Sequence, residues 1–238
     1  MFLKYRTKAF ILRHENRGES DQVFWVYSRD FGKIAVMAKG IRKLNSKLRG
    51  STQVFYLSEI EFVQGRGRKT LVDAVRVEKF AGLRESFLKL RLAHRFVRIF
   101  CHLVKSPIAE EALWQRLSRF FSEIDDASFL PNKAQLFYYF SFWRLLTALG
   151  YRPELYRCVF CRRKIAAPET FWQSRDGGLI CRNCSGRSAP RPRSVSAPAI
   201  KIIRFFLTHE WPMVRRLKAE PLVLREIKVI SQNYFYHH

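Results

Sequence analysis

The sequence is short of acidic residues. Only 20 of its 238 residues are Asp or Glu, against 44 Lys or Arg, which gives a formal net charge of +24. A charge this large makes a compact chain repel itself, and a polyanion would relieve that repulsion. Nucleic acid and an anionic membrane surface are the candidate polyanions. The spread of cations along the whole chain favours nucleic acid.

The sequence also lacks long apolar runs. It contains no stretch of about 18 consecutive apolar residues, which a transmembrane helix would require. The opening residues, MFLKYRTKAF, have neither the apolar segment nor the cleavage site of a signal peptide. We therefore expect a cytoplasmic, nucleoid-associated protein that does not bind membranes. In that compartment the 5 cysteines are expected to bind metal rather than to form disulfides.

The hydrophobic pattern predicts an α+β protein. Runs of β-branched and aromatic residues predict five short antiparallel strands, which suit a small barrel. A helical period follows, and the third predicted helix is apolar nearly all round, as a buried helix would be. We expect strands at 8–14, 22–28, 33–40, 53–64 and 69–80, and helices at 83–104, 110–124, 133–150, 197–207 and 220–235.

Composition divides the chain into consecutive segments. We expect a barrel at 1–80, a first helical part at 81–150, a zinc-binding module at 151–189 and a second helical part at 190–238. The stretch SAPRPRSVSAP, residues 188–198, resembles a linker in composition. The first helix is expected to bury one stripe, made of Leu83, Phe87, Leu90, His94, Val97 and Cys101, and the second to bury Leu113, Leu117, Phe120 and Ile124.

Two CxxC pairs are the most specific motif of the chain. Cys158 and Cys161 form the first pair, and Cys181 and Cys184 form the second after 19 intervening residues. This is the spacing of a four-thiolate zinc site. Because all four positions around the ion would be taken by protein, the single Zn²⁺ should be structural. The alternative interpretations are two redox pairs or cysteines that are incidental.

Motifs for catalysis are absent. The chain has no HExxH, and GRGRKT does not fit the Walker A frame. The CxxC pairs lack the Pro and the H-x-E of a zinc deaminase. Glu59 and Glu61 share a strand face, but an exposed face explains them better than a metal pair does. We therefore expect no catalytic residues and no enzyme activity.

The stretch AKGIRKLNSKLRGS is the most basic part of the predicted barrel. It holds Lys39, Arg42, Lys43, Lys47 and Arg49 without an acid, and it joins the third and fourth predicted strands. On the second strand, alternation places Trp25 and Tyr27 on one face and Phe24 on the other. One set must fill the core. The other could stack on bases, so Trp25 and Tyr27 are candidates for base stacking.

RGESDQVFWVYSRDFGKIAVMAKGIRK resembles the N-terminal segment of the bacterial RecO family of recombination mediators. The matching positions are Gly18, Glu19, Ser20, Asp21, Gly32, Lys33, Ala38, Lys39, Gly40, Arg42, Ser46 and Gly50. TALGYRPELYRCVFC is similar to the end of the family's helix and its first zinc knuckle. The resemblance implies an OB-fold barrel followed by a helical domain with a zinc module.

The resemblance also implies a function. Family members bind single- and double-stranded DNA, anneal complementary strands and, with RecR, help to load RecA onto DNA coated by single-stranded DNA-binding protein (SSB). The family's basic barrel surface corresponds to Lys39, Arg42, Lys43, Lys47 and Arg49 in this chain. The acidic tail of SSB is expected to bind the helical domain.

Two other hypotheses share part of the pattern. An RNA-binding or ribosome-associated zinc-ribbon protein would share the charge and the cysteines, but it does not predict the long helical part. A nucleic-acid enzyme with an unrecognised site is the third hypothesis. Incubating DNA with protein and metal, and looking for cleavage, would separate it from the other two.

Overall fold

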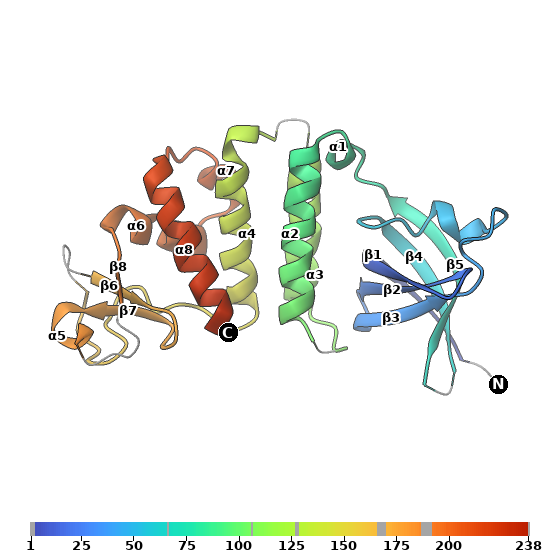
Figure 1. The fold of residues 1–238 in the computed structure, drawn as a ribbon, viewed down its shortest axis with the longest axis horizontal. Helices are drawn as coiled ribbons and strands as arrows, with labels where there is room; N and C mark the ends of the chain where they lie inside the picture. The colour runs from blue at the N-terminus through green and yellow to red at the C-terminus, as the bar shows by residue number, and fades with distance from the viewer. Residues whose placement is uncertain are drawn as a thin grey trace. The chain divides into compact units, whose positions relative to one another are not determined.

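The structure is a computed structural model that describes residues 3–65, 67–105, 107–126, 129–165, 170–186 and 192–237. The chain forms two compact units, Met1–Phe129 and Leu130–His238. The first unit contains the strands of a barrel and the first long helices, and the second contains further helices and a small sheet (Figure 1). None of the helices in the described ranges is long and apolar enough to cross a membrane. This architecture confirms the α+β class.

The first unit begins with a closed barrel, as predicted, and the barrel is OB-like. Its strands follow the order β1-β2-β3-β5-β4. The antiparallel prediction is wrong at one seam, where β3 and β5 are parallel and pair through Val36↔Lys69 and Met37↔Thr70. A parallel pair needs a long crossover, which the chain supplies by passing through β4. The strands are β1 (Lys4–Arg17), β2 (Asp21–Ser28), β3 (Gly32–Ala38), β4 (Leu57–Gln64) and β5 (Lys69–Glu78).

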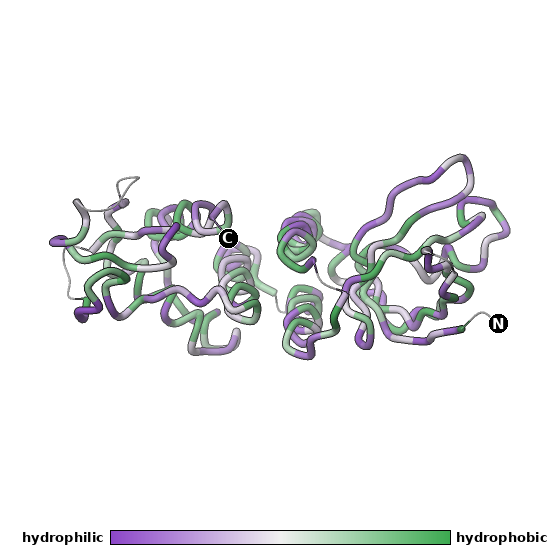
Figure 2. Tube along the Cα trace, turned by 90° about the horizontal axis from the view of Figure 1, so that it is seen from below, coloured by the Kyte–Doolittle hydropathy of each residue, from purple (hydrophilic) through white to green (hydrophobic). Residues whose placement is uncertain are grey.

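The period of two along the strands fills the barrel. Phe24 and Val26 of β2 face Val36 and Ile34 of β3, and all four are buried in one cluster with Phe62 of β4. Figure 2 shows that the chain of the barrel carries both hydrophobic and hydrophilic residues. The remaining face of β2 and β3 therefore lies outside the barrel, where the other set of side chains is available for other uses.

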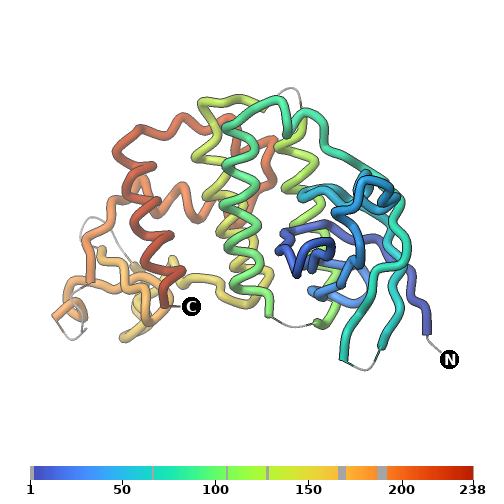
Figure 3. The backbone as a smooth tube through the Cα atoms, turned by 45° about the vertical axis from the view of Figure 1, so that its right-hand side comes forward, coloured from blue at the N-terminus to red at the C-terminus, as the bar shows by residue number. Residues whose placement is uncertain are grey.

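Among its described residues, the first unit also contains the helices α1 (Ala81–Arg84), α2 (Phe87–Leu103) and α3 (Glu111–Asp125). Figure 3 traces the chain from the barrel into α2 and α3. These two helices pack through Phe96 and Phe120, whose ring centroids lie 3.9 Å apart. The predicted core stripe of α3 is confirmed, since Leu113, Leu117, Phe120 and Ile124 are all buried.

The predicted stripe of the first helix is confirmed at Leu83 and Val97, which are buried, and is wrong at Phe87 and His94, which are exposed. The helical run breaks before Phe87, whose side chain is 80% exposed. The buried residues are Leu92, Ala93, Phe96, Val97 and Phe100, so the core face is rotated away from the expected one. Two apolar stripes overlap in this helix. The one with Phe96 and Phe100 faces the core, where these rings contact Phe120 and Tyr27.

The second unit is built around α4 (Ala134–Ala148). This helix is buried nearly all round, which confirms the prediction. Trp143 of α4 contacts Trp172 and Tyr234 at centroid distances of 5.8 and 5.1 Å, so one aromatic cluster joins the helices to the small sheet. The other elements are β6 (Thr170–Gln173), β7 (Gly178–Cys181), α5 (Arg182–Ser185), β8 (Arg193–Ser194), α6 (Ala197–Thr208), α7 (Trp211–Val214) and α8 (Pro221–His237). The described residues also form two short 3₁₀ helices, η1 (Lys47–Gly50) and η2 (Pro131–Lys133).

The linker predicted at 188–198 is wrong in its described part, residues 192–198, and 188–191 lie outside the described residues. β8 pairs with β6, and Val195 is buried. Ser196 caps α6 by accepting a hydrogen bond from the Ala199 N–H, and its own hydroxyl donates to Glu226 at 2.5 Å. Pro and Ser therefore serve here to start a helix, which composition alone does not distinguish from a linker.

Candidate metal centre and nucleic-acid interface

The four cysteines of the two CxxC pairs come together in the second unit. The sulfur atoms of Cys158, Cys161, Cys181 and Cys184 all lie within 4.8 Å of one another. The second pair begins at the end of β7 and continues into α5, whereas the first pair lies in a turn beside that strand. Four thiols held this close could hold a metal ion.

Backbone hydrogen bonds fix the turn that carries Cys158 and Cys161. The Cys158 N–H donates to the Arg163 carbonyl, and the Arg162 N–H donates back to the Cys158 carbonyl, both at 2.9 Å. Arg162 has a φ of 60°, which is the left-handed conformation that glycine adopts most easily. The Val159 N–H donates to Leu179 of β7 at 2.9 Å, so the turn is fixed to the strand that carries the second pair.

The thiols of the cluster differ in acidity. Burial opposes ionisation of Cys158, but hydrogen bonds from backbone groups of both CxxC turns outweigh it and lower the pKa of this thiol to about 6. Burial, together with hydrogen bonds to the other cysteines, raises the pKa of Cys184 to about 12. The site thus stabilises one thiolate by itself, and further thiolates would need a cation among them.

The basic stretch of the first unit forms an exposed loop between β3 and β4. Its five cations, Lys39, Arg42, Lys43, Lys47 and Arg49, are all exposed, and η1 lies within the loop. Gly40 turns the chain with a φ of 62°, and the Lys43 N–H donates to its carbonyl at 3.1 Å. The loop therefore presents its cations from a folded backbone. Their contact with DNA stays a prediction.

One carboxylate anchors this loop to the barrel. Asp21, at the start of β2, accepts a hydrogen bond from the Gly40 N–H at 2.8 Å. That hydrogen bond is the main cause of the lowered pKa of Asp21, and the positive charges of Lys39 and Lys43 act in the same direction. The Arg42 N–H also donates to the Ser20 carbonyl at 3.0 Å. The GESD and AKG motifs thus meet at one point.

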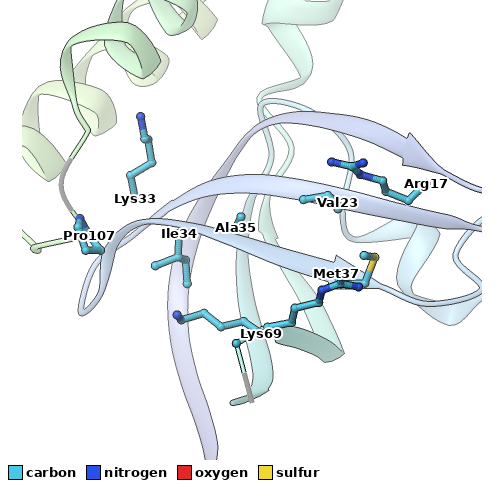
Figure 4. Close-up of a pocket in the computed structure, with 10 residues that line it drawn as sticks. Arg17, Val23, Lys33, Ile34, Ala35, Met37, Lys69 and Pro107 are labelled. Atoms are coloured by element: carbon cyan, nitrogen blue, oxygen red, sulfur yellow. The ribbon is translucent and has the colours of Figure 1, made fainter. Parts of the chain in front are cut away.

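The outer face of β2 and β3 carries a second basic surface. Val23 pairs with Met37 and Trp25 with Ala35, so these four side chains share the face. A pocket of about 510 Å³ lies along it, and Figure 4 shows Lys33 pointing toward the helices while Arg17 comes from β1. Its lining residues are Arg17, Val23, Lys33, Ile34, Ala35, Met37, Gly67, Arg68, Lys69 and Pro107.

The two candidate stacking residues have different surroundings. Tyr27 is fully buried, packs edge-on against Phe100 at 5.1 Å, and its hydroxyl donates to the Glu110 carbonyl at 3.3 Å. Its ring is therefore inaccessible to a base in this structure, because the helices of the first unit cover this end of the face. Trp25 is half-buried, with the guanidinium of Arg13 3.8 Å above its ring. Base stacking by Trp25 stays a prediction.

The paired glutamates of β4 have ordinary partners. Glu59 bonds Arg6 at 2.7 Å, and Glu61 bonds Lys4 at 3.1 Å. These ion pairs tie β4 to β1 and explain both side chains without a metal.

Cys101, expected in the core, is half-buried, and its carbonyl accepts a hydrogen bond from Lys33 at 2.6 Å.

Comparison with known proteins follows this division of the chain. The family model Recombination protein O N terminal matches residues 1–80, and Recombination protein O C terminal matches residues 85–238. The chain belongs to the RecO family. The family resemblance expected from the GESD and AKG motifs is therefore confirmed, and the boundary between the two matches falls at the end of the barrel.

Curated RecO proteins are similar over nearly the whole chain. "DNA repair protein RecO" of Dehalococcoides mccartyi is 28% identical over 225 residues, which is 94% of this chain and 87% of that protein. The protein of the same name from Pelotomaculum thermopropionicum is 30% identical over 98% of this chain and 89% of its own length. That from Bacillus pumilus is 25% identical over 97% and 87%.

Sequence reasoning missed the residues that α2 brings to the barrel of this RecO family member. Arg95, Arg98 and His102 lie on α2 and line a pocket together with Trp25 and Lys33. The signal was present as a basic stripe with spacings of three and four residues. It was hidden because the same helix carries two apolar stripes, and the wrong one was assigned to the core.

Proposed function

We propose that this chain is a DNA repair protein that acts as a recombination mediator of the RecF pathway. It binds single- and double-stranded DNA and anneals complementary strands. With RecR, it helps to load RecA onto SSB-coated DNA in the bacterial cytoplasm. It binds its partners and catalyses no reaction. Family membership supports this function, since the curated relatives carry the name "DNA repair protein RecO".

The observation that carries the proposal is the basic loop between β3 and β4. Its five exposed cations face solvent on a backbone held by Asp21, and within the loop, residues 39–56, no residue is acidic. Cations on a surface loop neutralise phosphates of any sequence and leave the base edges uncovered. An annealing protein needs this kind of binding, because the two strands must still pair through those edges.

Zinc is the ion that best fits the four cysteines. In a tetrahedral zinc site with a Zn–S bond of about 2.3 Å, two sulfurs would lie about 3.8 Å apart. The sulfurs of Cys161 and Cys181 are 3.7 Å apart. A site closed by four thiolates leaves no position for water or substrate, so one structural Zn²⁺ would join the two turns and supply no chemistry to DNA binding.

Among the protein partners, SSB is expected to contribute its acidic C-terminal tail, which the helical part of the chain would bind. The proposal predicts that SSB without this tail binds much more weakly, with the tail peptide alone as the control. Undiminished binding of tail-less SSB, measured by calorimetry, would contradict this part. RecR would join the same complex, and RecA would follow on the DNA.

An annealing assay tests the proposed function. Complementary strands coated with SSB are mixed with the full chain, and duplex formation is followed by fluorescence of end labels. We expect faster annealing than with SSB alone. A protein that binds RNA strongly, leaves SSB-coated DNA unannealed and ignores SSB would instead be a zinc-ribbon RNA-binding protein. Cleavage of the strands in the presence of metal would indicate an enzyme.

A further inference from the structure

A second pocket of the first unit lies where α2 passes the outer face of the barrel. It measures about 660 Å³, within the range of about 300–1,000 Å³ that is common for small-ligand sites. Among the described residues that line it, none is acidic. The barrel contributes Leu12, Arg13, Trp25 and Lys33, and α2 contributes His94, Arg95, Val97, Arg98, Cys101 and His102.

The barrel side of this pocket is a flat, cationic stack. Trp25 lies between Arg13 of β1 and Ala35 of β3 in one cross-strand row. The Arg13 guanidinium covers the Trp25 ring at 3.8 Å and bonds Glu15 at 2.8 Å, so its plane is held in position. Aromatic rings and guanidinium planes are the surfaces on which proteins stack unpaired bases.

The helix side supplies the positive charges of Arg95 and Arg98. Arg95, Arg98 and His102 follow one another at helical spacing and therefore lie on the same side of α2. Lys33 of β3 donates to the carbonyl of Cys101 at 2.6 Å, which ties the barrel to the last turn of this helix. Burial lowers the pKa of Lys33, and the charges of Arg13 and Lys105 lower it further. A bound anion would offset this repulsion.

We propose that this pocket, named the α2 pocket, binds one unpaired nucleotide of a DNA strand, with its base on the Trp25–Arg13 stack and its phosphate on Arg98. This inference rests on the proposed function. The pocket would give the protein a means of distinguishing single-stranded DNA from duplex DNA. A paired base has both faces covered by its neighbours in the helix, so it cannot reach the stack. The basic loop binds phosphates of either form, whereas the α2 pocket requires an unstacked base.

The pocket of Figure 4 shows how a strand would continue. It shares Lys33 with the α2 pocket and extends along the same outer face to Arg17 and Lys69. Its apolar floor comes from Val23 and Met37, which pair with each other. A strand with one base in the α2 pocket would therefore meet further cations for its next phosphates.

Substitutions of Trp25 and Arg98 test the inference in the full-length protein. Trp25→Ala should weaken binding to a short oligo(dT) about tenfold, because one base–aromatic stack is lost, and Trp25→Phe should retain most of the affinity. Duplex affinity should change less than about twofold. Arg98→Ala should lower the salt slope on single strands by about 0.7, the value for one lost phosphate contact. Arg91→Ala is the matched control, since Arg91 is exposed on the same helix two turns earlier and does not line the pocket.

Tryptophan fluorescence gives a second readout. Trp25 is half-buried, and the other tryptophans, Trp114, Trp143, Trp172 and Trp211, are buried. Saturable quenching by oligo(dT) should therefore report Trp25 and disappear in Trp25→Phe. If dTMP gives stronger saturable quenching than oligo(dT) at the same nucleotide concentration, the pocket binds a free nucleotide and the assignment to a DNA strand is overturned. Quenching by an acidic peptide but not by oligo(dT) would overturn it in favour of a protein partner.

The two proposals fail in different ways. If the wild-type protein binds and anneals DNA but Trp25→Ala changes neither single-strand affinity nor selectivity over duplex, the α2 pocket is not a nucleotide site and the proposed function stands. An equal loss on single strands and duplex would also overturn the pocket assignment. If the wild-type protein binds no DNA, the proposed function itself is wrong.

Discussion

Replacing Arg42, Lys43 and Lys47 with Ala should change the salt dependence of DNA binding by a calculable amount. All three side chains are exposed on the loop between β3 and β4, so each can meet one phosphate. Each phosphate contact contributes about 0.7 to the salt slope on single strands and about 0.9 on duplex. The triple variant should therefore lose about 2.1 units of slope on single strands and about 2.7 on duplex. Between about 50 and 200 mM salt, the affinity ratio of wild type to variant should shrink about 18-fold and 42-fold, respectively.

The measurement is fluorescence anisotropy of labelled strands at several salt concentrations and in several sequences. Substituting Arg215, Arg216 and Lys218 with Ala removes the same charge from an exposed segment of the second unit and is the matched control. The loop hydrogen bonds run mainly between backbone groups, so the thermal midpoint should stay nearly constant. An unchanged slope, an equal change in the control, or a loss that depends on base sequence would refute this role of the loop.

Other predictions concern metal and backbone. Metal analysis of fresh protein should give one zinc per chain, and Cys158→Ser or chelation should raise hydrogen exchange around the four cysteines but not in the barrel; a metal-free, folded wild type would contradict this. Arg162→Gly should stabilise the folded cysteine site by about 1 kcal/mol, because glycine adopts the left-handed φ of 60° without strain. A chelator should then remove the metal less readily. Gly32→Ala should destabilise the protein by at least about 2 kcal/mol, since its Cβ would lie 2.4 Å from the Ile108 carbonyl oxygen at a φ of 61°. Gly18→Ala, at a φ of 58° with nothing within 4 Å, should cost less in the same thermal unfolding experiment.

The elements that could be predicted from the sequence are those whose hydrophobic pattern allows the element to be buried in only one way. β3 buries every second residue and α4 is buried nearly all round, so each had one way to be buried. α2 was mispredicted because two stripes competed, and only the partner rings on α3 and β2 decide between them. The parallel β3–β5 seam was missed for a similar reason, since strand pattern specifies inward and outward faces but not which strands become neighbours.

The candidate sites differ in the same way. The four cysteines were predictable because a four-thiolate site depends on short CxxC spacing within each pair, and the fold only has to bring two turns together. The α2 pocket could not be predicted, because it depends on where a helix passes a sheet. Tyr27 and Trp25 share a strand face, yet the helices cover the first and leave the second half-exposed. Alternation identifies the face but not how much of it is covered.

The acids of the barrel explain where its positive charge can act. Residues 1–80 contain 17 Lys or Arg and 8 Asp or Glu. On the β1–β4 side, Glu59 and Glu61 neutralise Arg6 and Lys4. Asp21 is used to hold the Gly40 N–H, and Asp30 accepts from Thr7 at 2.6 Å. These acids form ion pairs between strands or hydrogen bonds within the fold. No acid is among the described residues that line the α2 pocket, and the basic loop, residues 39–56, contains no acid.

A protein that needed its excess charge only for solubility would have no reason to separate the charges in this way. Acids spread evenly among the cations would lower the self-repulsion at no cost to folding. Here Glu59 and Glu61 balance the β1–β4 face and Glu15 pairs with Arg13, whereas the basic loop contains no acid and no acid is among the described residues that line the α2 pocket. Adding acids to the basic loop in one variant, and removing acids from the β1–β4 face in another, therefore tests the proposed role of the loop in DNA binding. Placing two glutamates at Asn45 and Ser46 should leave the fold intact and lower the salt slope on single strands by about 1.4, the value for two lost phosphate contacts, whereas removing Glu59 and Glu61 should add charge without adding affinity. Stronger DNA binding by the second variant, matched to its added charge, would show that net charge alone governs the interaction.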